Sequence, residues 1–486
     1  MESISLIVAV DKNGGISKNG VIPWKIKEDT NFFMDVTKRE YVKGLKNILI
    51  MGKTTWMACR DTLKNRVIMV VSSTANIDGY EDTHLAISVK DAINKSVSLV
   101  ETRVVGHVFI CGGSNIYREA CNLYNINTIY LTEIDDDYGC DNHIRDIVEF
   151  FESYYNTYSA HTFNIVDLND YTSKKITFKK LYISLPNHWR PREEDQYLGL
   201  LEDILTNGHF RQTRNSTTWS LFSKHLEFDL SKGFPLFTTR RSFFKGIAEE
   251  LFFFLRGQTS SKILEEKGIN IWKGNSSREF LDSVNLNYPE GAIGNMYGYQ
   301  WSHFGFPYQG PDYDYTNKGF NQLDACINLL KTDPYSRRIM MTTFDPSTAD
   351  QGVLRPCHSL FIQFYVEKGH RLSMTCYNRS QDVFLGTNFN VPSSSLLIYL
   401  FCEVINNDVN YTGPTFTPGR LIMNLGDCHI YEDHRTMALR QILRDPFPFP
   451  QLKITRKVTK LTDFCFEDLE LDNYECYPNI IAKMIA

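Results

Sequence analysis

A change of pattern near residues 185–192 constrains this chain more than any other feature of its sequence. A strand-like run over residues 176–183 ends there, prolines follow at Pro186 and Pro191, and a charged helix start comes next at Glu193-Glu194-Asp195. A chain of 486 residues also exceeds what one hydrophobic core usually serves. We therefore expect two domains, residues 1–185 and 193–486, joined by a short linker at residues 186–192.

The composition, with 42% hydrophobic and 22% charged residues, is ordinary for a globular protein. A net charge of −5 argues against non-specific nucleic-acid binding, so an anionic ligand would need a local cluster of arginines. The cysteines form no CxxC pair, which favours reduced thiols and leaves no readable zinc site. The amino terminus lacks a basic region, and its apolar run at residues 4–10 is too short for a signal peptide or a membrane span. We expect a cytosolic protein that needs neither a membrane nor a metal.

Short apolar, β-branched runs recur through the first segment, at residues 6–10, 47–51, 67–71, 108–110 and 128–132. Runs of this length read as buried strands, and the stretches between them as crossover helices. The pattern predicts a mostly parallel α/β sheet with ligands at the carboxyl ends of its strands. The second segment mixes helical patterns with long aromatic strands.

Three of these runs end in residues suited to holding phosphate at a strand-to-helix turn. They are Met51-Gly52-Lys53-Thr54-Thr55, Ser72-Ser73-Thr74 and Gly112-Gly113-Ser114-Asn115. Small residues, hydroxyls and free N–H groups at a helix amino terminus favour anions. A glycine after a strand is usually only a turn, but three such turns at one sheet edge favour a dinucleotide, although no G-x-G-x-x-G fingerprint is present.

Asp29 follows Ile22-Pro23-Trp24 and opens a helix-like stretch. An aspartate in this place most often caps the helix. The residues alone leave open whether Asp29 is such a cap or a catalytic carboxylate.

In order along the chain, the first segment carries Val8-Ala9-Val10, Gly14-Gly15-Ile16, Ile22-Pro23-Trp24 with Asp29, Met51-Gly52-Lys53-Thr54-Thr55-Trp56, Arg66, Ser72-Ser73, Ile110-Cys111-Gly112-Gly113, Tyr117 and Tyr130-Leu131-Thr132. With these runs, residues 1–183 resemble dihydrofolate reductase. The resemblance implies that Asp29, supported by Thr132, binds the pterin ring and promotes its protonation. It also implies that Arg66 clamps the glutamyl carboxylate. The other substrate-binding residues implied are Phe33, which would pack on the benzoyl ring, Val8 and Trp24.

The same resemblance implies NADPH as the cofactor, and Lys53 near a ribose phosphate would favour NADPH over NADH. Ser17 stands where the family often has glycine in its mobile loop. The residues that would line the cofactor are Ala9, Gly15, Ile16, Gly20, Lys53, Thr54, Thr55, Ser72, Ser73, Ile110, Gly112, Gly113, Ser114, Asn115 and Tyr117.

Two features of the second segment carry chemistry. Glu250 lies in a very apolar stretch, residues 246–257, where a carboxylate is costly to bury without a partner or a task, so a structural ion pair and a catalytic role are both open. Cys357 lies in Leu354-Arg355-Pro356-Cys357-His358, and Tyr377-Asn378-Arg379-Ser380-Gln381-Asp382 follows. A lone cysteine is usually a small buried hydrophobe, but an arginine close by favours the thiolate, and a cation beside a hydroxyl suits a phosphate.

Further runs in this segment are residues 250–257, Ile271-Trp272 with Asn275, Tyr297-Gly298-Tyr299-Gln300-Trp301, Asp333-Pro334-Tyr335-Ser336-Arg337-Arg338, Gly386 with Asn390, and Gly426-Asp427-Cys428-His429-Ile430-Tyr431. Together with the two motifs around Cys357, they make residues 192–486 resemble thymidylate synthase. The resemblance implies an α+β domain with a mixed sheet and helices. Departures from the family fall at Asn215, Ser216, Asn295, Met296 and Arg355.

The resemblance implies that Cys357 adds to the pyrimidine ring of dUMP, which then captures the one-carbon unit of 5,10-methylenetetrahydrofolate. Glu250 would organise waters for proton transfer, and Asn390 would read the uracil edge. The family completes its phosphate site with two arginines of the other subunit, here Arg337 and Arg338, which implies a homodimer. The remaining implied residues are His358 at the substrate, His429 and Tyr431 for the deoxyribose, Arg214, Arg379 and Ser380 for the phosphate, and Asp382, Trp272, Asn275, Leu385, Gly386 and Phe389 for the pterin.

A reductase ahead of a synthase resembles the bifunctional enzymes of protists and plants, in which dihydrofolate made at one site is the substrate of the other. Two alternatives stay open. A hydroxymethylase of cytosine nucleotides would share the architecture, but the amide of Asn390 suits uracil, whereas an aspartate would suit cytosine. The amino-terminal segment could be an inactive scaffold, although its Asp29, Arg66 and Thr132 argue against that.

Overall fold

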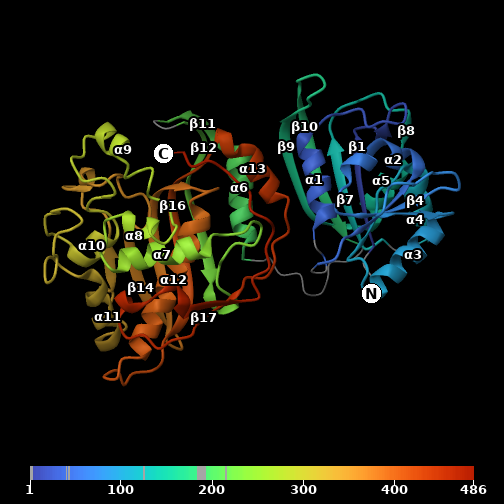
Figure 1. Cartoon of the computed structure of the whole chain (residues 1–486). Helices are drawn as coiled ribbons and strands as arrows, with labels where there is room; N and C mark the ends of the chain where they lie inside the picture. Colours follow the sequence, from blue (N-terminus) through green and yellow to red (C-terminus); the bar gives the residue numbers. More distant parts are fainter. Residues whose placement is uncertain are drawn as a thin grey trace. The chain divides into compact units, whose positions relative to one another are not determined.

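The computed structural model describes residues 4–39, 41, 44–123, 126–182, 193–213 and 216–485. Over its whole length the chain forms two compact units, Met1–Arg190 and Pro191–Ala486 (Figure 1). The linker expected at residues 186–192 and the expected phosphate ligand Arg214 lie outside the described residues.

An eight-stranded sheet forms the centre of the first unit, in the order β5-β4-β3-β6-β1-β7-β10-β9. The strands from β5 to β7 run parallel, while β10 and β9 are antiparallel at one edge. Each of the runs expected to be a strand forms one, and the mostly parallel α/β prediction is confirmed. The strands are β1 Ile4–Asp11, β3 Ile48–Gly52, β4 Val67–Val71, β5 Thr83–Ala86, β6 Val108–Ile110, β7 Thr128–Ile134, β9 Asn156–Val166 and β10 Ser173–Tyr182.

Helices cover both faces of this sheet (Figure 1). Buried side chains of α3 (Val89–Glu101), α4 (Ser114–Leu123) and α5 (Arg145–Tyr154) share one core with Leu6 and Val8 of β1. On the opposite face, Phe32 of α1 (Lys27–Lys38) packs on Phe178 and Tyr130, with ring centroids 4.8 and 6.2 Å away. The central strands are buried on both faces, which is why they form continuous apolar runs in the sequence.

The carboxyl ends of β3, β4 and β6 lie at one edge of the sheet, because these strands are parallel neighbours. Helix α2 (Lys53–Cys59) begins directly after β3, and α4 begins soon after β6. The prediction of a helix after Ser72-Ser73-Thr74 is wrong, because the chain goes on to β5 and no helix forms before α3. Turn chemistry explains the difference: Asn76 Oδ1 accepts a hydrogen bond from Asp78 N at 2.9 Å, and Gly79 has a φ of 85°.

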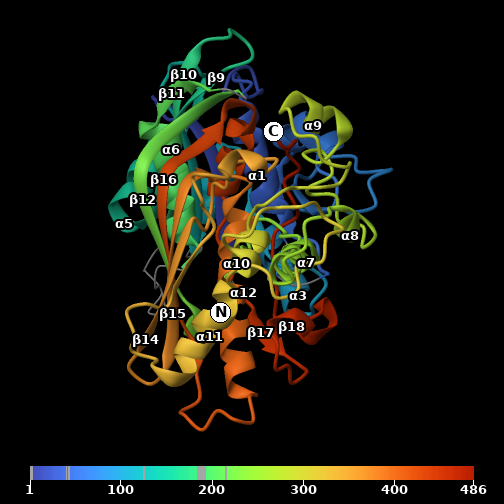
Figure 2. The ribbon, with the colours of Figure 1, turned by 90° about the vertical axis from the view of Figure 1, so that its left-hand side faces the viewer.

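A six-stranded mixed sheet forms the centre of the second unit, in the order β11-β12-β16-β15-β14-β13. The β15–β16 pair is parallel and the others are antiparallel, so the α+β prediction is confirmed. Figure 2 shows β12, β16, β15 and β14 side by side. The strands are β11 His209–Gln212, β12 Thr217–Asp229, β13 Met340–Thr342, β14 Phe361–Glu367, β15 Arg371–Asp382 and β16 Thr417–Tyr431.

Helices pack on this second sheet within the same unit. Contacts join α12 to β15 and β16, α6 to β12 and β16, and α13 to β16, while α7 packs on α12. A two-stranded sheet joins β17 (Gln451–Ile454) to β18 (Leu469–Asp472). The helices are α6 Asp195–Asn207, α7 Phe244–Leu255, α8 Lys262–Glu265, α9 Arg278–Ser283, α10 Gly298–His303, α11 Gln322–Thr332, α12 Thr387–Asn406 and α13 Arg435–Ile442.

One face of the six-stranded sheet carries exposed apolar side chains. Along β14, Phe364 is buried, whereas Phe361 and Tyr365 are 41% and 68% exposed. Register places Tyr377 opposite Phe361 and Met340 opposite Gln363, so both lie on this face, and they are 42% and 48% exposed. A row of large apolar side chains on a sheet face marks a surface that another molecule covers.

Candidate active sites

Asp29 lies in the first turn of α1 and does not cap it, so the interpretation as a helix cap is wrong. Its Oδ2 instead accepts a hydrogen bond from Nε1 of the buried Trp24 at 3.2 Å. Burial raises the pKa of Asp29 from 3.8 to about 6, against the lowering effect of hydrogen bonds from Trp24 and Thr132. Thr132 on β7 is buried and pairs with Ala9 of β1. Val8 directly precedes Ala9 in β1. The carboxyl group can therefore exchange a proton near neutral pH.

Arg66 lies deeper than an exposed carboxylate clamp would, with only 1% of its surface exposed. Its guanidinium donates to Thr37 Oγ1 at 2.8 Å and to the carbonyl oxygen of Thr62 at 3.2 Å, and it lies 6.0 Å from the ring centroid of Phe33. The Nε atom is buried without a hydrogen-bond partner. A buried donor that lacks a partner is what an incoming carboxylate would satisfy.

The three turns expected to hold phosphate meet at the sheet edge. Lys53 Nζ donates to the carbonyl oxygen and Oγ1 of Thr74 at 3.3 and 3.1 Å, which joins the turn after β3 to the turn after β4. Ser72 Oγ accepts from Thr74 N at 3.0 Å within the second turn. Gly52 N donates to the carbonyl oxygen of Gly112 at 2.8 Å, which joins the first turn to the third. Thr54 and Thr55 lie in the first turn of α2, and Ser73 lies in the turn after β4.

The third turn needs glycine at Gly112, because the ring of Tyr117 packs against its backbone. Gly112 has a φ of 95°, and a Cβ atom on it would lie 2.7 Å from the ring of Tyr117. Tyr117 is buried and donates to the carbonyl oxygen of Ile7 at 2.8 Å, which holds the ring in place. Ile110 ends β6, Gly113 precedes α4, and Ser114 and Asn115 form its first turn, where N–H groups face outward. The residues present therefore fit the phosphates of a dinucleotide.

Neighbouring segments hold the loop around Ser17. Asp11 Oδ1 accepts from Gly15 N at 2.7 Å, and Asp141 Oδ2 accepts from Asn19 N at 2.7 Å. Strand β2 (Gly15–Ser17), which contains Ile16, pairs with β8 (Asn142–His143). Gly20 has a φ of 78°, and a Cβ atom there would lie 3.6 Å from Thr54, so the loop ends beside the first turn of α2.

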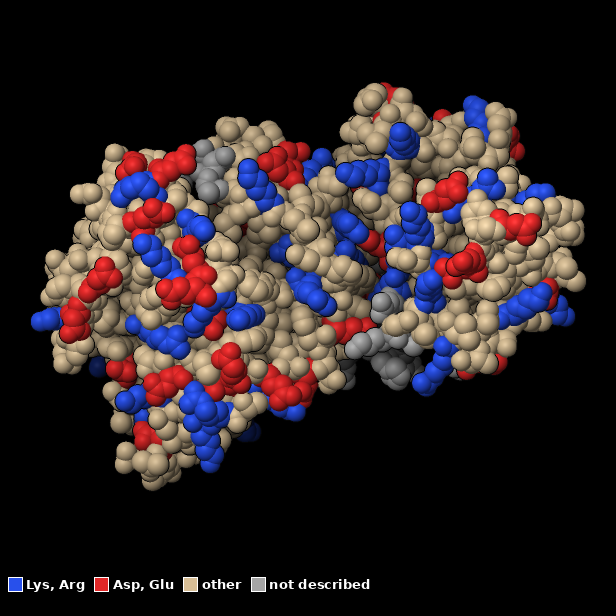
Figure 3. All heavy atoms as spheres, viewed as in Figure 1, with Lys and Arg blue, Asp and Glu red and all other residues tan. Residues whose placement is uncertain are grey.

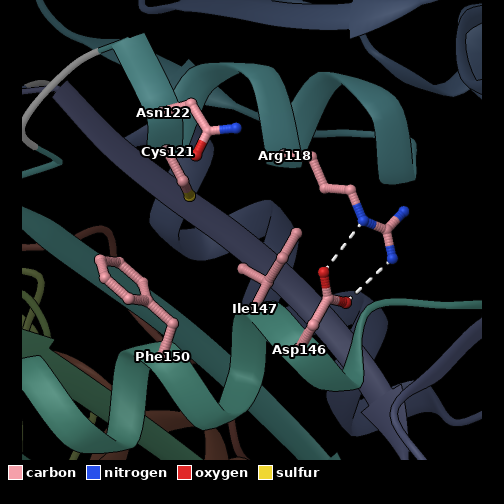
Figure 4. Close-up of a pocket in the computed structure, with 6 residues that line it drawn as sticks. All are labelled: Arg118, Cys121, Asn122, Asp146, Ile147 and Phe150. Carbon is pink, nitrogen blue, oxygen red and sulfur yellow. Dashed lines mark hydrogen bonds and ion pairs between the residues drawn. The ribbon is translucent and has the colours of Figure 1, made fainter.

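A hollow elsewhere in the first unit is separate from these residues. Its volume is about 240 Å³. Figure 4 shows that its lining residues come from α4 and α5. Arg118 and Asp146 form a two-bonded ion pair at 3.1 and 2.9 Å along one wall. The other lining residues are Cys121, Asn122, Ile147 and Phe150. None of the residues expected to bind a ligand lines this hollow.

In the second unit, Cys357 lies on the loop before β14, beside a tyrosine. Its Sγ is 3.6 Å from the hydroxyl of Tyr297, which also accepts from Cys357 N at 3.3 Å. The buried ring of Tyr297 stacks on Phe254 and His358, with centroids 5.1 and 4.4 Å away. Tyr297 was not among the expected site residues; its only signal in the sequence was the run Tyr297-Gly298-Tyr299-Gln300-Trp301.

Arg379 supports the Cys357 loop through the main chain. Its guanidinium donates to the carbonyl oxygens of Pro356 and Arg355, both at 2.9 Å, and Ser380 N donates to the carbonyl oxygen of Cys357 at 3.4 Å. The side chain of Arg355 pairs instead with Asp350, at 2.5 and 2.8 Å. Arg355, two residues before Cys357, is thus engaged elsewhere, and Arg379 of β15 contacts the Cys357 loop instead.

Glu250 has no ion pair with any described residue, so the interpretation as a structural ion pair is wrong. Its Oε1 accepts from Trp272 Nε1 at 2.8 Å, and Asn275 follows in the same segment, also buried. The neighbouring Glu249 is the one that pairs with Lys267, at 2.6 Å. Burial raises the pKa of Glu250 to about 7, although the bond from Trp272 lowers it. This carboxyl group is suited to proton transfer near neutral pH.

The remaining expected residues gather around the start of α12. Asp382 Oδ1 accepts from Leu385 N at 2.9 Å, and the carbonyl oxygen of Gly386 accepts from Phe389 N and Asn390 N at 3.0 and 2.8 Å. His429 Nδ1 lies 3.1 Å from Asp427 Oδ1, and the His429 and Tyr431 ring centroids are 5.2 Å apart. Val383 N donates to the carbonyl oxygen of His429 at 2.9 Å, which ties the two groups together. Burial lowers the pKa of His358 to about 4, so its imidazole is neutral at pH 7.

Arg337 and Arg338 lie away from Cys357 in the same chain. Both are exposed and precede β13, whose Met340 pairs with Gln363 of β14. Arg338 is therefore level with Tyr365, whereas Cys357 precedes the other end of β14. At about 3.3 Å per residue, Tyr365 lies roughly 13 Å from Phe361 at the start of β14, and Cys357 lies four residues further, on the loop. These arginines cannot reach the Cys357 site of their own chain.

Among the described residues, no group of His, Cys, Asp and Glu side chains is placed to hold a metal ion. No helix in the described ranges has the length and apolar composition needed to cross a membrane.

On the face shown in Figure 3, acidic and basic side chains alternate over the second unit.

Comparison with known families and proteins gives matches over nearly the whole chain. Residues 195–486 match the model of the family described as thymidylate synthase, and residues 3–180 match that described as dihydrofolate reductase. A bifunctional dihydrofolate reductase-thymidylate synthase 1 of Arabidopsis thaliana is 35% identical, over 99% of this chain and 95% of its own length. The protein named bifunctional dihydrofolate reductase-thymidylate synthase in Paramecium tetraurelia is 33% identical, over 99% of both chains.

Proposed function

Because the chain belongs to the family of bifunctional dihydrofolate reductase-thymidylate synthases, we propose that its two units make dTMP and recover the folate that this reaction consumes. The second unit methylates dUMP with 5,10-methylenetetrahydrofolate, and the first reduces the resulting dihydrofolate to tetrahydrofolate. We assign the reductase to residues 1–185 and the synthase to residues 193–486. A cytosine-nucleotide hydroxymethylase and an inactive first unit are not favoured, because both family models match and the relatives are named for both activities.

The observation that carries the synthase assignment is the group around Cys357. A thiol, the hydroxyl of Tyr297 at 3.6 Å and a half-buried carboxyl at Glu250 with a pKa of about 7 combine a nucleophile with groups that can move protons. Cys357 adds to the pyrimidine ring of dUMP, and Glu250 organises the proton transfers that follow. Arg379 and Ser380 hold the phosphate, His429 and Tyr431 contact the deoxyribose, and Asn390 reads the base.

In the first unit, the observation that supports the reductase is the raised pKa of the Asp29 carboxyl group, in the same unit as the three joined turns. Asp29, with a pKa of about 6, promotes protonation of the pterin while Thr132 and Trp24 orient it. NADPH supplies the hydride when it is bound. Lys53 and the turn at Gly112 and Gly113 hold its phosphates, and Arg66 binds the glutamyl carboxylate.

A homodimer completes the synthase site in this proposal. Arg337 and Arg338 are exposed, precede β13 and lie away from their own Cys357, which supports a role at the phosphate of a partner chain. The exposed sheet face with Phe361, Tyr365 and Tyr377 supports this, because a second copy would cover these side chains. No membrane and no nucleic acid is needed for either reaction.

We place the protein in the cytosol. All eleven cysteines are free. They include the half-buried Cys357, which must stay reduced to act as a nucleophile. A reducing compartment keeps such thiols from oxidation.

A single assay tests the two activities together. Purified protein with dUMP, 5,10-methylenetetrahydrofolate and NADPH should yield dTMP, NADP and tetrahydrofolate, because the folate product of one site is the substrate of the other. Omitting NADPH should leave dTMP formation and let dihydrofolate accumulate. Formation of dTMP without any NADPH oxidation would show that the first unit is not a reductase, and absence of dTMP would exclude the synthase.

Co-expression of two damaged chains tests the shared site. A chain with Cys357→Ser and a chain with Arg337→Ala and Arg338→Ala should each form dimers with little synthase activity. Random pairing gives mixed dimers in which one of two sites is intact, so we expect recovery of about one quarter of wild-type activity. Mixed dimers seen by native mass spectrometry without such recovery would contradict the shared site.

A further inference from the structure

A chain of buried amide side chains joins Ser359, on the Cys357 loop, to Asn390. Ser359 N donates to Asn378 Oδ1 at 2.8 Å, and Asn378 Nδ2 donates to Gln381 Oε1 at 2.7 Å. The same Gln381 Oε1 accepts from Asn390 Nδ2 at 3.2 Å. Asn378 and Gln381 are 0% and 1% exposed, so water does not compete for these bonds.

Main-chain groups fix the direction of every bond in this network. Ser359 N–H can only donate, so the Asn378 atom beside it is the oxygen, and the NH₂ group of Asn378 faces Gln381. At the other end, the carbonyl oxygen of Asp382 can only accept and lies 3.3 Å from Gln381 Nε2. The oxygen of Gln381 therefore faces both asparagines, and Asn390 must turn its NH₂ group toward Gln381.

We propose that Gln381 is a positioning residue that holds the amide of Asn390 in the orientation that reads uracil, a role that rests on the proposed synthase function. With one N–H bonded to Gln381, Asn390 keeps its second N–H and its oxygen for the base. Uracil offers an N–H at ring position 3 and an acceptor at O4, which match these two groups. Cytosine offers the reverse pattern, an acceptor at N3 and an amino donor.

The selectivity for uracil follows from the hydrogen bond between Gln381 and Asn390 rather than from Asn390 alone. An asparagine amide that is free to turn by half a rotation can present either pattern and can accept either base. When Gln381 holds this amide, the N3 acceptor of cytosine would face the Asn390 oxygen and the amino donor would face the Asn390 N–H. Neither pair can form a hydrogen bond, which costs binding energy in a buried site. Gln381 thus acts on the choice of pyrimidine without touching it.

Gln381→Met tests this role, because methionine keeps the length of the side chain and removes the acceptor. We expect the ratio of dCMP to dUMP dissociation constants, measured by equilibrium binding, to fall by about tenfold or more. Equal weakening of both nucleotides would indicate a structural role only and would overturn the proposal. Failure of the wild-type protein to bind dUMP would instead reject the proposed function itself.

Two further variants separate the acceptor from the shape of the side chain. In its protonated form, Gln381→Glu keeps an oxygen that both asparagines can bond and a donor for the carbonyl oxygen of Asp382. It should therefore retain the preference for dUMP, and loss of that preference would contradict the proposal even if Gln381→Met does not fold. Thr387→Val is the matched control. It removes the hydroxyl that accepts from Gln381 Nε2 at 3.1 Å but leaves the carbonyl oxygen of Asp382, so the preference should stay unchanged.

Discussion

Replacing Cys357 by serine should lower the rate of dTMP formation by about 10⁴-fold or more, while NADPH oxidation with added dihydrofolate stays at the wild-type rate. A serine hydroxyl has a far higher pKa than a thiol, so almost no oxyanion is present at neutral pH to attack the pyrimidine. The side chain keeps its size and can still bond the hydroxyl of Tyr297, which contacts Sγ at 3.6 Å in the wild type. Both rates are measured on the same preparation, with thymidylate detected by chromatography and NADPH by absorbance.

A second cysteine, on the sheet that follows the Cys357 loop, provides the control. Cys376 on β15 is buried, and burial raises its pKa to about 12, so it carries no thiolate at neutral pH. Cys376→Ala should leave dTMP formation close to wild type. An undiminished rate with Cys357→Ser would end the assignment of the nucleophile, and equal losses in the two variants would point to damage to the sheet.

Much of the first unit could be predicted from sequence because its strands are buried on both faces. Runs such as residues 67–71 and 108–110 have no polar positions, and β4 and β6 occupy those residues. The prediction of a helix after β4 was wrong because Ser72 and Thr74 resemble a helix start, whereas Asn76 and Gly79 form local turns. The signal for the correct structure lay a few residues further along the chain than the motif.

Partners distant in the sequence explain what could not be predicted at the sites. Nothing local distinguishes Glu249 from Glu250, yet Lys267 pairs with the first and Trp272 with the second. Likewise, the sequence suggested an arginine beside the thiol, but Arg355 turns to Asp350, and only the pairing of β14 with β15 brings Arg379 to the loop. Residue type predicts which side chains can carry chemistry, and the fold decides which of them meet.

Each unit has a half-buried carboxyl group of raised pKa at its proposed site. Asp29 and Glu250 each lie on a helix that packs against the central sheet or its helices, and each bonds the indole N–H of a tryptophan. In both, burial outweighs the bond from the tryptophan, giving pKa values of about 6 and about 7. Holding these groups out of water costs stability, which is the expected signature of a functional site.

Replacing Asp29 by asparagine should lower the rate of dihydrofolate reduction by about 10²- to 10⁴-fold, without change in dTMP formation. The amide keeps the size of the side chain and a bond with Trp24, but it cannot exchange a proton with the pterin near neutral pH. Glu28→Gln, in the same turn of α1, is the control and should leave both rates unchanged. Equal loss of both activities in the Asp29 variant would be incompatible with two separate sites.

The same variant should gain stability at high pH, which distinguishes lost chemistry from misfolding. The pKa of Asp29 is raised from 3.8 to about 6, so between these values the folded state binds more protons than the unfolded state. The unfolding free energy of the wild type therefore falls as pH rises through this window and stays lower above it. Asparagine does not ionise, so Asp29→Asn should be more stable than wild type by about 1 to 3 kcal/mol at pH 8 and no more stable at pH 4. Denaturant unfolding of the first unit at both pH values measures this, and a less stable variant at pH 8 would contradict the buried carboxylate on which the reductase assignment depends.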